Sequence, residues 1–366
     1  MALSKGAAEA AEIVRNYDGP KIRVMEVCGT HTHEIFRLGI RQMLPESIEL
    51  ISGPGCPVCV TPVGYIDEAV MLALEKGVKI FTFGDLIRVP GTKKSLADAR
   101  SEGAEVQIVY SPMDALDYAK AHPEEEVCFL SVGFETTTPG SVIALRNAIS
   151  EKVENFSLLT ANKIMEPAYL ALKGSADAFL YPGHVSTMTG MEVYRKIAKE
   201  WQISGVVTGF TTSEIVTALA TVVRRVEEVR AGERESFAEN CYPSVVTEEG
   251  SPAARKLVDK YMEPCDTEWR GLGIIPGSGM KLREEFSKYD ARVRFQLPKV
   301  QGKASPACRC GEVLRGLIRP MDCKIYGNAC TPEHPVGACM VSSEGACSAY
   351  YKYGAETEIR YRGGIQ

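Results

Sequence analysis

Short apolar runs alternate with helix-like stretches from about residue 21 to residue 231, and this alternation restricts the fold more than any other feature of the sequence. The runs are rich in β-branched and aromatic residues, and each ends in Gly, Cys, Pro, Ser or Thr. Strands that are apolar throughout and joined by helices are typical of parallel sheets buried on both faces. The sequence therefore predicts an α/β protein with two α/β domains, whose parallel sheets face a central cleft.

The alternation also gives the expected positions of the elements. Strands are predicted at 21–28, 47–52, 79–84, 105–111, 126–134, 156–163, 178–184 and 203–210. Helices are predicted at 64–76, 113–122, 140–149, 165–172, 190–200, 213–231 and 253–262.

A chain of 366 residues is long enough for two or three domains of roughly 150 residues each. We expect a first α/β domain at 1–115 and a second at 116–232. After Gly232 the alternation stops, and Pro, Gly and Cys recur at short intervals through 233–366. Because a segment with few periodic apolar faces needs another source of stability, such as a metal cofactor, we expect a Cys-rich, metal-stabilised third domain at 233–366.

The charge balance and the first residues limit the classes of partner. Lys and Arg number 42 against 47 Asp and Glu, which gives a net charge of -5 without a basic block, so no nucleic-acid partner is expected. Residues 1–20 carry charges throughout and lack the apolar region of a signal peptide. The longest apolar runs, such as 127–134, are too short to span a bilayer. We therefore expect no membrane association and a cytoplasmic location.

Twelve cysteines are unusual in a chain of this length, and half of them lie in a short C-terminal segment. These six are Cys308, Cys310, Cys323, Cys330, Cys339 and Cys347. A zinc site and an iron–sulfur cluster both need four thiolates, and the spacing alone does not choose between them. Six cysteines are two more than a closed zinc site needs, which favours a cluster beside a redox dithiol. In an extended Cys-X-Cys the side chains point to opposite faces, so Cys308 and Cys310 would serve different partners.

Chemically unusual motifs follow several predicted strands, at the sheet edge where open α/β sheets bind ligands. The first motif contains Cys28, His31 and His33, and the second contains Cys56 and Cys59. A helix is predicted after the Cys-X-X-Cys pair, and its dipole would lower a thiol pKa and favour thiolate chemistry. These motifs predict a metal or catalytic site beside a redox-active thiol pair.

Each motif also has a purely structural explanation. Cys28 alone could be a small buried apolar residue, and the two histidines could cap the following helix. The Cys-X-X-Cys pair could be half of a structural zinc site. Glu135 and His184, in glycine-containing segments after two further strands, could serve catalysis or only hold their loops.

Taken in order, the motifs resemble those of one known family over nearly the whole chain. They are CGTHTH at 28–33, GPGCPVC at 53–59, GFETTTP at 133–139, PGHVST at 182–187, and the cysteine-rich tail that begins CRCGEVLRG at 308. The chain resembles the HypD-type [NiFe]-hydrogenase maturation factors.

The resemblance implies two α/β domains and a third domain with a [4Fe-4S] cluster, in surroundings like those of ferredoxin:thioredoxin reductase. It implies four cluster ligands, namely Cys308, Cys323, Cys330 and Cys347. Cys310 and Cys339 are then the dithiol or disulfide next to the cluster. It also implies Cys28 as an iron ligand, with His31 and His33 at the same site, and Cys56 with Cys59 as the redox pair of the cleft.

The resemblance further implies a role in building the Fe(CN)2CO group of the hydrogenase. The protein would act with a HypC-type chaperone and accept cyanide from a HypE-type partner, with a HypF-type carbamoyltransferase upstream. Our leading hypothesis is a redox-active scaffold that holds this iron transiently, with imidazoles or Glu135 handling protons. Two rivals remain: a stand-alone iron–sulfur thiol–disulfide oxidoreductase, and a zinc-stabilised binding module.

Overall fold

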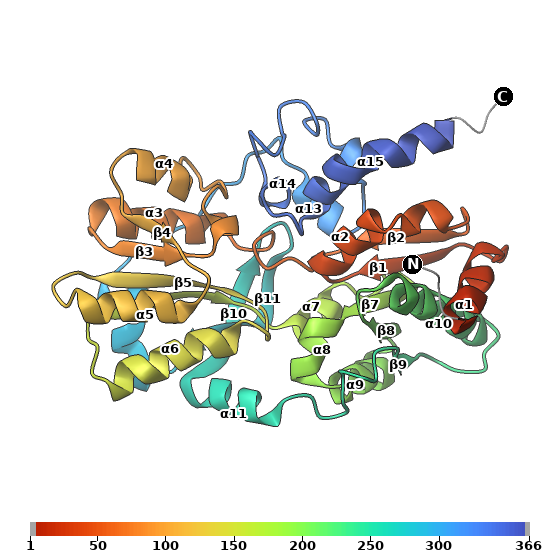
Figure 1. Cartoon of the computed structure of the whole chain (residues 1–366), viewed down its shortest axis with the longest axis horizontal. Helices are drawn as coiled ribbons and strands as arrows, with labels where there is room; N and C mark the ends of the chain where they lie inside the picture. The colour runs from red at the N-terminus through yellow and green to blue at the C-terminus, as the bar shows by residue number, and fades with distance from the viewer. Residues whose placement is uncertain (1–4, 363–366) are drawn as a thin grey trace.

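Two parallel β-sheets form the centre of the computed structural model, which describes residues 5–362 (Figure 1). In spatial order, sheet A contains β2 (Ile48–Ser52), β1 (Ile22–Glu26), β7 (Ala178–Pro182), β8 (Gly205–Thr208) and β9 (Ala238–Asn240). Sheet B contains β4 (Val106–Ile108), β3 (Lys79–Thr82), β5 (Val127–Gly133) and β6 (Phe156–Asn162). All neighbouring strands within each sheet are parallel, so the predicted α/β class with parallel sheets is confirmed.

Helices connect the strands. They are α1 (Lys5–Arg15), α2 (Gly29–Arg37), α3 (Val63–Glu75), α4 (Leu96–Ser101), α5 (Pro112–Ala121), α6 (Thr138–Ser150), α7 (Met165–Ala171), α8 (Gly183–Thr189), α9 (Glu192–Trp201), α10 (Thr212–Arg230), α11 (Pro252–Tyr261), α12 (Ala291–Arg294), α13 (Cys310–Leu314), α14 (Ala338–Val341) and α15 (Ala346–Arg362). The seven helices that the apolar spacing predicts are present as α3, α5, α6, α7, α9, α10 and α11, with ends that differ by a residue or two, and the other helices were not predicted. Four short 3-10 helices are η1 (Ile40–Met43), η2 (Gly84–Leu86), η3 (Glu284–Tyr289) and η4 (Pro320–Asp322).

Local sequence accounts for these elements. Every residue of β5 is buried, as expected for a strand covered on both faces of a parallel sheet. The long helix α10 begins with a capping box, in which the Thr211 side chain accepts from the backbone of Glu214 and the Glu214 carboxylate accepts in return. Its buried residues, such as Ile215 and Leu219, pack on sheet A.

The strand order corrects the expected division into consecutive domains. The range 1–115 supplies β1 and β2 to sheet A but β3 and β4 to sheet B, and 116–232 is divided in the same way. The chain therefore leaves sheet A after β2, builds sheet B, and returns to sheet A at β7. The spacing of apolar residues indicates that a strand is buried but not which strand lies beside it. The sequence therefore could not predict that the chain leaves sheet A and returns to it.

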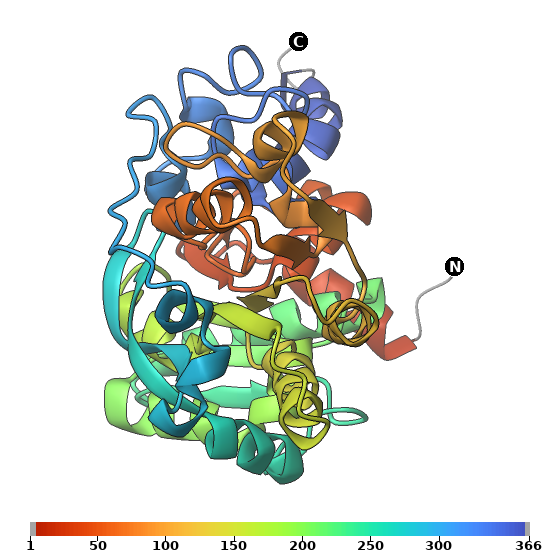
Figure 2. The ribbon, with the colours of Figure 1, turned by 90° about the vertical axis from the view of Figure 1, so that its left-hand side faces the viewer.

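The expected third domain, 233–366, is also divided. Strand β9 joins the edge of sheet A, while β10 (Met262–Trp269) and β11 (Gly273–Leu282) form an antiparallel hairpin. The hairpin lies beside β6, to which Gly279 is bridged through Lys163. In Figure 2 the teal hairpin runs along one side of the molecule, and the blue cysteine-rich residues lie at one end, beside the red and orange residues of the first motifs. Residues 1–4 and 363–366, at the ends of the expected first and third domains, lie outside the described residues.

One of the three apolar clusters among the described residues continues from sheet A to sheet B. It includes Met25 and Tyr181 of sheet A, Ile80 and Leu130 of sheet B, and Trp269 of the hairpin. The expected central cleft stays a prediction. Among the described residues, no helix is long and apolar enough to cross a membrane.

Candidate functional site

The first two motifs meet at one edge of sheet A, because β1 and β2 are parallel neighbours and both end there. Cys28 is the N-cap residue of α2 and is only 6% exposed. The backbone N–H of Gly29 donates to the Gly55 carbonyl at 3.0 Å. A Cβ on Gly55 would lie 2.1 Å from the Cys28 backbone nitrogen, so only glycine allows this approach. The structure thus places GPGC directly against Cys28.

A buried carboxylate that we did not single out from the sequence supports this edge. Glu26, at the end of β1, is fully buried. Its carboxylate accepts from the hydroxyls of Thr32 at 2.7 Å and Ser52 at 3.2 Å, and it is paired with the Arg41 guanidinium. A glutamate at the end of a mainly apolar strand was the only signal of this role. These contacts fix α2, and with it Cys28, relative to both strands.

His31 and His33 do not share a site, although the resemblance implies that they do. At 100° per residue, two positions separated by two residues lie about 200° apart around an α-helix. His31 is fully buried, with Nε2 3.0 Å from the Gly209 carbonyl oxygen. His33 instead lies against the C-terminal segment, with Nδ1 3.3 Å from the Ser343 carbonyl oxygen and Nε2 3.3 Å from the Tyr353 hydroxyl.

The His31 imidazole is neutral and incompletely hydrogen-bonded. Burial lowers its pKa to about 4, and Nδ1 is buried without a partner among the described residues. Its ring lies 4.7 Å from the ring of Phe210, which also stacks on exposed His184 at 4.2 Å. The CGTHTH and PGHVST motifs are therefore brought together through one phenylalanine that follows β8.

Cys56 and Cys59 form a turn before α3, with the Cys59 backbone N–H donating to the Cys56 sulfur at 3.3 Å. Helix α3 begins only at Val63, so the pair does not stand at the helix N-terminus as we expected. Burial is the largest influence on Cys59 and raises its pKa well above its usual value. The predicted lowering of the thiol pKa by the helix dipole is thus wrong for Cys59.

Thiol contacts continue from this pair to the C-terminal cysteines. The Cys339 thiol lies next to Cys310 and Cys59, and the interaction with these two thiols lowers the pKa of Cys339. Cys310 in turn contacts Cys308, so the expected opposite orientation of these two side chains is wrong. The expectation fails because α13 begins at Cys310 and the backbone of the preceding residue, Arg309, is not extended. The five thiols therefore form a series, in the order Cys56, Cys59, Cys339, Cys310 and Cys308.

All six C-terminal cysteines line one small cavity, together with Val313, Ile325 and Met340. Burial, then the charges of Cys308, Cys310, Cys330 and Cys323, raise the pKa of Cys347. Within the described residues, no three His, Cys, Asp or Glu side chains are grouped to hold a single metal ion. A closed zinc site needs four side chains around one ion, whereas a four-iron cluster spreads its thiolates over separate irons. Six thiols at one cavity supply the four thiolates that either kind of site needs, so the choice between zinc and a cluster stays a prediction.

Arg270 is a buried cation next to the thiols. It lies in the turn between β10 and β11, is 5% exposed, and donates from a terminal nitrogen to the Pro90 carbonyl at 2.7 Å. Burial lowers the pKa of Arg270, and the nearby thiols Cys310, Cys339, Cys308 and Cys59 act in the opposite direction. Nothing in the spacing of the sequence connected this arginine with the cysteines.

Glu344 is a second residue that we did not single out. Its carboxylate accepts from the Thr30 hydroxyl at 2.6 Å, and its side chain packs on Gly29, next to Cys28. Burial first, and Glu344 among its neighbours, raise the pKa of Cys28 to about 12. The adjacent Ser342 donates to Asp85 at 2.8 Å. The cysteine-rich segment therefore closes over the first motif.

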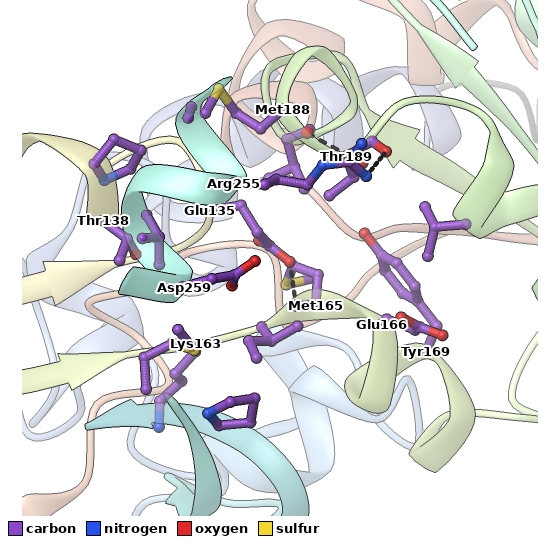
Figure 3. A pocket seen from close by; sticks show the side chains of 18 of the residues that line it. Glu135, Thr138, Lys163, Met165, Glu166, Tyr169, Met188, Thr189, Arg255 and Asp259 are labelled. Carbon is purple, nitrogen blue, oxygen red and sulfur yellow. Dashed lines mark hydrogen bonds between the residues drawn. The ribbon is translucent and has the colours of Figure 1, made fainter. Parts of the chain in front are cut away.

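Glu135 lies in a different place. Its Oε1 accepts from the backbone N–H of Met165 at 2.8 Å, and burial raises its pKa to about 7. It lines a cavity whose described lining includes no cysteine and no histidine (Figure 3). These contacts do not support the hypothesis that Glu135 handles protons at the iron.

Known proteins with similar sequences belong to one family. Residues 4–354 match the HypD family model, described as "Hydrogenase formation hypA family". The chain belongs to the HypD family. It is 43% identical over 337 residues to hydrogenase maturation factor HypD of Escherichia coli (strain K12), covering 91% of this chain and 89% of the relative.

Two further HypD relatives show similar coverage. HypD of Cupriavidus necator is 41% identical over 353 residues, which cover 93% of this chain and 92% of the relative. HypD2 of Bradyrhizobium diazoefficiens is 42% identical over 344 residues, which cover 91% and 89%. The similarity to HypD therefore extends over both sheets and the cysteine-rich segment.

Proposed function

We propose that this chain is a hydrogenase maturation factor that serves as a redox-active scaffold for assembling the Fe(CN)2CO group of a [NiFe]-hydrogenase. A HypC-type chaperone would bind with it, a HypE-type protein would supply cyanide, and a HypF-type carbamoyltransferase would act upstream. Membership of the HypD family supports the maturation role. All twelve cysteines, each within the described residues, are free thiols, which favours a reducing compartment such as the cytoplasm.

The observation that carries the redox part of the proposal is the thiol series. It joins the turn beside Cys28 to the cavity lined by six cysteines, through the contact between Cys59 and Cys339. A series of neighbouring thiols is what disulfide exchange needs, because a thiolate must reach the sulfur that it attacks.

We assign a [4Fe-4S] cluster to the six-cysteine cavity, with Cys308, Cys323, Cys330 and Cys347 as its ligands. When bound, the cluster supplies single-electron transfer. Cys310 and Cys339 remain as the neighbouring dithiol. The interaction between these two thiols lowers the pKa of Cys339, which makes Cys339 the better nucleophile of the two.

The exchange between the two pairs can be written with atoms and electrons balanced. The Cys339 thiolate attacks Cys59 of a Cys56–Cys59 disulfide, and Cys56 leaves as a thiolate. The Cys310 thiol then loses its proton to this thiolate and attacks Cys339, which releases Cys59. The Cys310–Cys339 pair has lost two electrons and become a disulfide, and the Cys56–Cys59 pair has gained them as a dithiol.

Cys28 is the proposed protein ligand of the iron that is being assembled. Thiolate is a soft ligand, and the backbone beside Cys28 is fixed by Gly55 and by the contacts of Glu26. The Fe(CN)2CO iron is the substrate here, and its remaining protein ligand would come from the chaperone. The imidazoles of His31 and His184, which meet at Phe210, are the proposed proton-handling groups.

A Cys28→Ala substitution tests the iron assignment. We expect loss of the infrared bands of iron-bound cyanide and carbonyl in the complex isolated anaerobically with the small chaperone, because the variant lacks the thiolate ligand. Cys241→Ala, at a partly buried cysteine outside the thiol series, is the matched control and should retain the bands. Bands of normal intensity in the Cys28 variant would contradict the assignment.

Anaerobic purification with metal analysis tests the cluster. A [4Fe-4S] protein is brown and bleaches on reduction, whereas zinc is spectroscopically silent. We expect about four irons per chain in the parent protein and loss of colour in Cys330→Ser, with Cys265→Ser as the control. A colourless protein with stoichiometric zinc would instead support the zinc-stabilised module. Turnover of protein disulfides without any maturation partner would support the stand-alone oxidoreductase.

A further inference from the structure

A second cavity, of about 260 Å³, lies apart from the cysteines, between the loop after β5, helices α7, α8 and α9, and the segment that contains α11 (Figure 3). Its wall is mainly apolar. The apolar lining includes Met165, Val185, Met188, Val193, Tyr194 and Met280. Buried tyrosines form its inner part, whereas Arg255 and Asp259 of α11 are exposed and lie toward solvent. A cavity of this size suits a small molecule rather than a large cofactor.

Two buried polar atoms at this cavity have no partner among the described residues. One is Oε2 of Glu135, whose other oxygen accepts from Met165. The second is the hydroxyl of Tyr169, a residue only 1% exposed, which lies near the Tyr194 hydroxyl but makes no hydrogen bond with it. Figure 3 shows both side chains on the cavity wall. Buried polar groups in folded proteins are nearly always hydrogen-bonded, so two orphans at one cavity point to a ligand that completes them.

The two cationic side chains near Glu135 donate their hydrogen bonds to backbone carbonyl groups and not to Glu135. Lys163 lines the cavity with its aliphatic stem, but its Nζ donates to the Glu268 carbonyl at 2.7 Å and lies 5.2 Å from the Trp269 ring. Arg255 donates to the backbone carbonyls of Thr189 and Glu249. Within the described part of the chain, Glu135 forms no ion pair. Its carboxylate is therefore a buried negative charge without a compensating cation.

Burial of this uncompensated charge raises the pKa of Glu135 to about 7. The titratable groups that face it are Lys163 of the segment after β6, Glu166 and Tyr169 of α7, Tyr194 of α9, and Arg255 and Asp259 of α11. Burial also lowers the pKa of Lys163 to about 7. Displacement of two pKa values toward neutrality at one cavity is typical of a functional site.

We propose that this cavity binds a small organic ammonium ion, with the ammonium group on Glu135 and an apolar body among the methionines and tyrosines. An ammonium group donates to both orphan oxygens and supplies the missing positive charge. The faces of Tyr169 and Tyr194 attract a cation, and the apolar lining accepts hydrocarbon. A small anion would meet the Glu135 carboxylate, and a neutral alcohol would leave its charge uncompensated.

Calorimetric titration of the full-length protein with n-butylammonium chloride tests the proposal, with 1-butanol as the neutral probe of equal shape. We expect butylammonium to bind at least tenfold more tightly than butanol at pH 8. Between pH 6 and pH 8 a carboxyl group of pKa about 7 changes from roughly one-tenth to roughly nine-tenths ionised, so affinity should rise about tenfold. Lys163 loses its proton over the same range, which acts in the same direction.

A Glu135→Gln substitution distinguishes the effect of Glu135 on binding from that of Lys163. It should lower butylammonium affinity at least tenfold at pH 8 and flatten the pH dependence, while Asp259→Asn, which removes an exposed carboxylate at the same cavity, should change affinity less than twofold. Ala254→Phe is a second variant that fills the cavity from α11 without touching Glu135, and it should abolish binding in a protein with unchanged circular dichroism. Absent binding, equal binding of butanol, or full affinity in both the Glu135 and Ala254 variants would overturn the proposal. None of these results depends on iron, so they are independent of the proposed maturation function.

Discussion

Burial decides the protonation state of His31 more than its neighbours do. The ring is fully buried, and the cost of desolvating an imidazolium outweighs its contact with the Gly209 carbonyl. Its folded pKa of about 4 lies below the ordinary value of 6.5, so the unfolded chain binds more protons between these two values. Stability from this group is therefore complete above pH 6.5 and is lost as the pH falls toward 4.

Substitution of His31 by Gln should reduce this acid sensitivity. In urea unfolding, the parent protein should lose up to about 3 kcal/mol between pH 6.5 and pH 4 through this residue, and His31→Gln should lose correspondingly less. His122→Gln, at a half-buried histidine stacked on Tyr118, is the control for removal of an imidazole. Equal pH dependence of His31→Gln and the parent protein would show that His31 is charged in the folded state.

At the scale of an element, glycine permits the contact between the two motifs. The loop after β2 approaches the Cys28 backbone so closely that a Cβ on Gly55 would lie 2.1 Å from its nitrogen. Gly55→Ala should therefore destabilise the protein by about 1–3 kcal/mol through overpacking, measured by chemical denaturation. Gly6→Ala is the control, since Gly6 lies in α1 with open space around it, and it should be neutral or stabilising. A neutral Gly55→Ala would mean that the two loops are not in contact.

The β10–β11 hairpin is the element that brings a positive charge to the thiols. Arg270 lies in its turn, and Gly271 next to it packs on Gly311. A buried guanidinium stabilises thiolates and thereby the reduced form of a dithiol. Arg270→Met should therefore lower the reduction potential of the Cys310–Cys339 pair, by on the order of 30 mV for each ~1.4 kcal/mol of lost stabilisation. Arg270→Lys retains the positive charge and should keep a reduction potential close to that of the parent protein. Equal potentials in the parent protein and in both variants would contradict this role of Arg270.

The sequence predicts the elements well because their signals are local. Apolar runs and capping residues locate β5 and α10 within a few residues of their observed ends. The motifs at strand ends likewise predict that the CGTHTH and GPGCPVC motifs lie together, and Gly55 does lie against Cys28. The roles of Arg270 and Glu344 could not be predicted, since each depends on a contact between segments that are distant in the sequence. We had expected His31 and His33 to share a site. They point to different sides because both lie in the α-helix α2, two positions apart.

At the scale of the whole molecule, the exchange of strands between sheets makes the two halves interdependent. Strands β1 and β2 need β7 to continue sheet A, and β3 needs β5 to continue sheet B. A fragment of residues 1–115 should therefore lack a cooperative unfolding transition, measured by circular dichroism during urea titration. The full chain should show one. A cooperative transition in the fragment would mean that the expected first domain folds alone.

The contact between Thr30 and Glu344 spans 314 positions of the sequence. A ribosome makes the chain from its N-terminus, so the CGTHTH motif emerges long before the segment that covers it. Until residue 344 has left the ribosome, Cys28 lacks its acidic neighbour, and the Cys56–Cys59 turn lacks its contact with Cys339. Because of the order of synthesis, the first two motifs are made before the residues that contact them, and the thiol series can form only after Cys339 has been made.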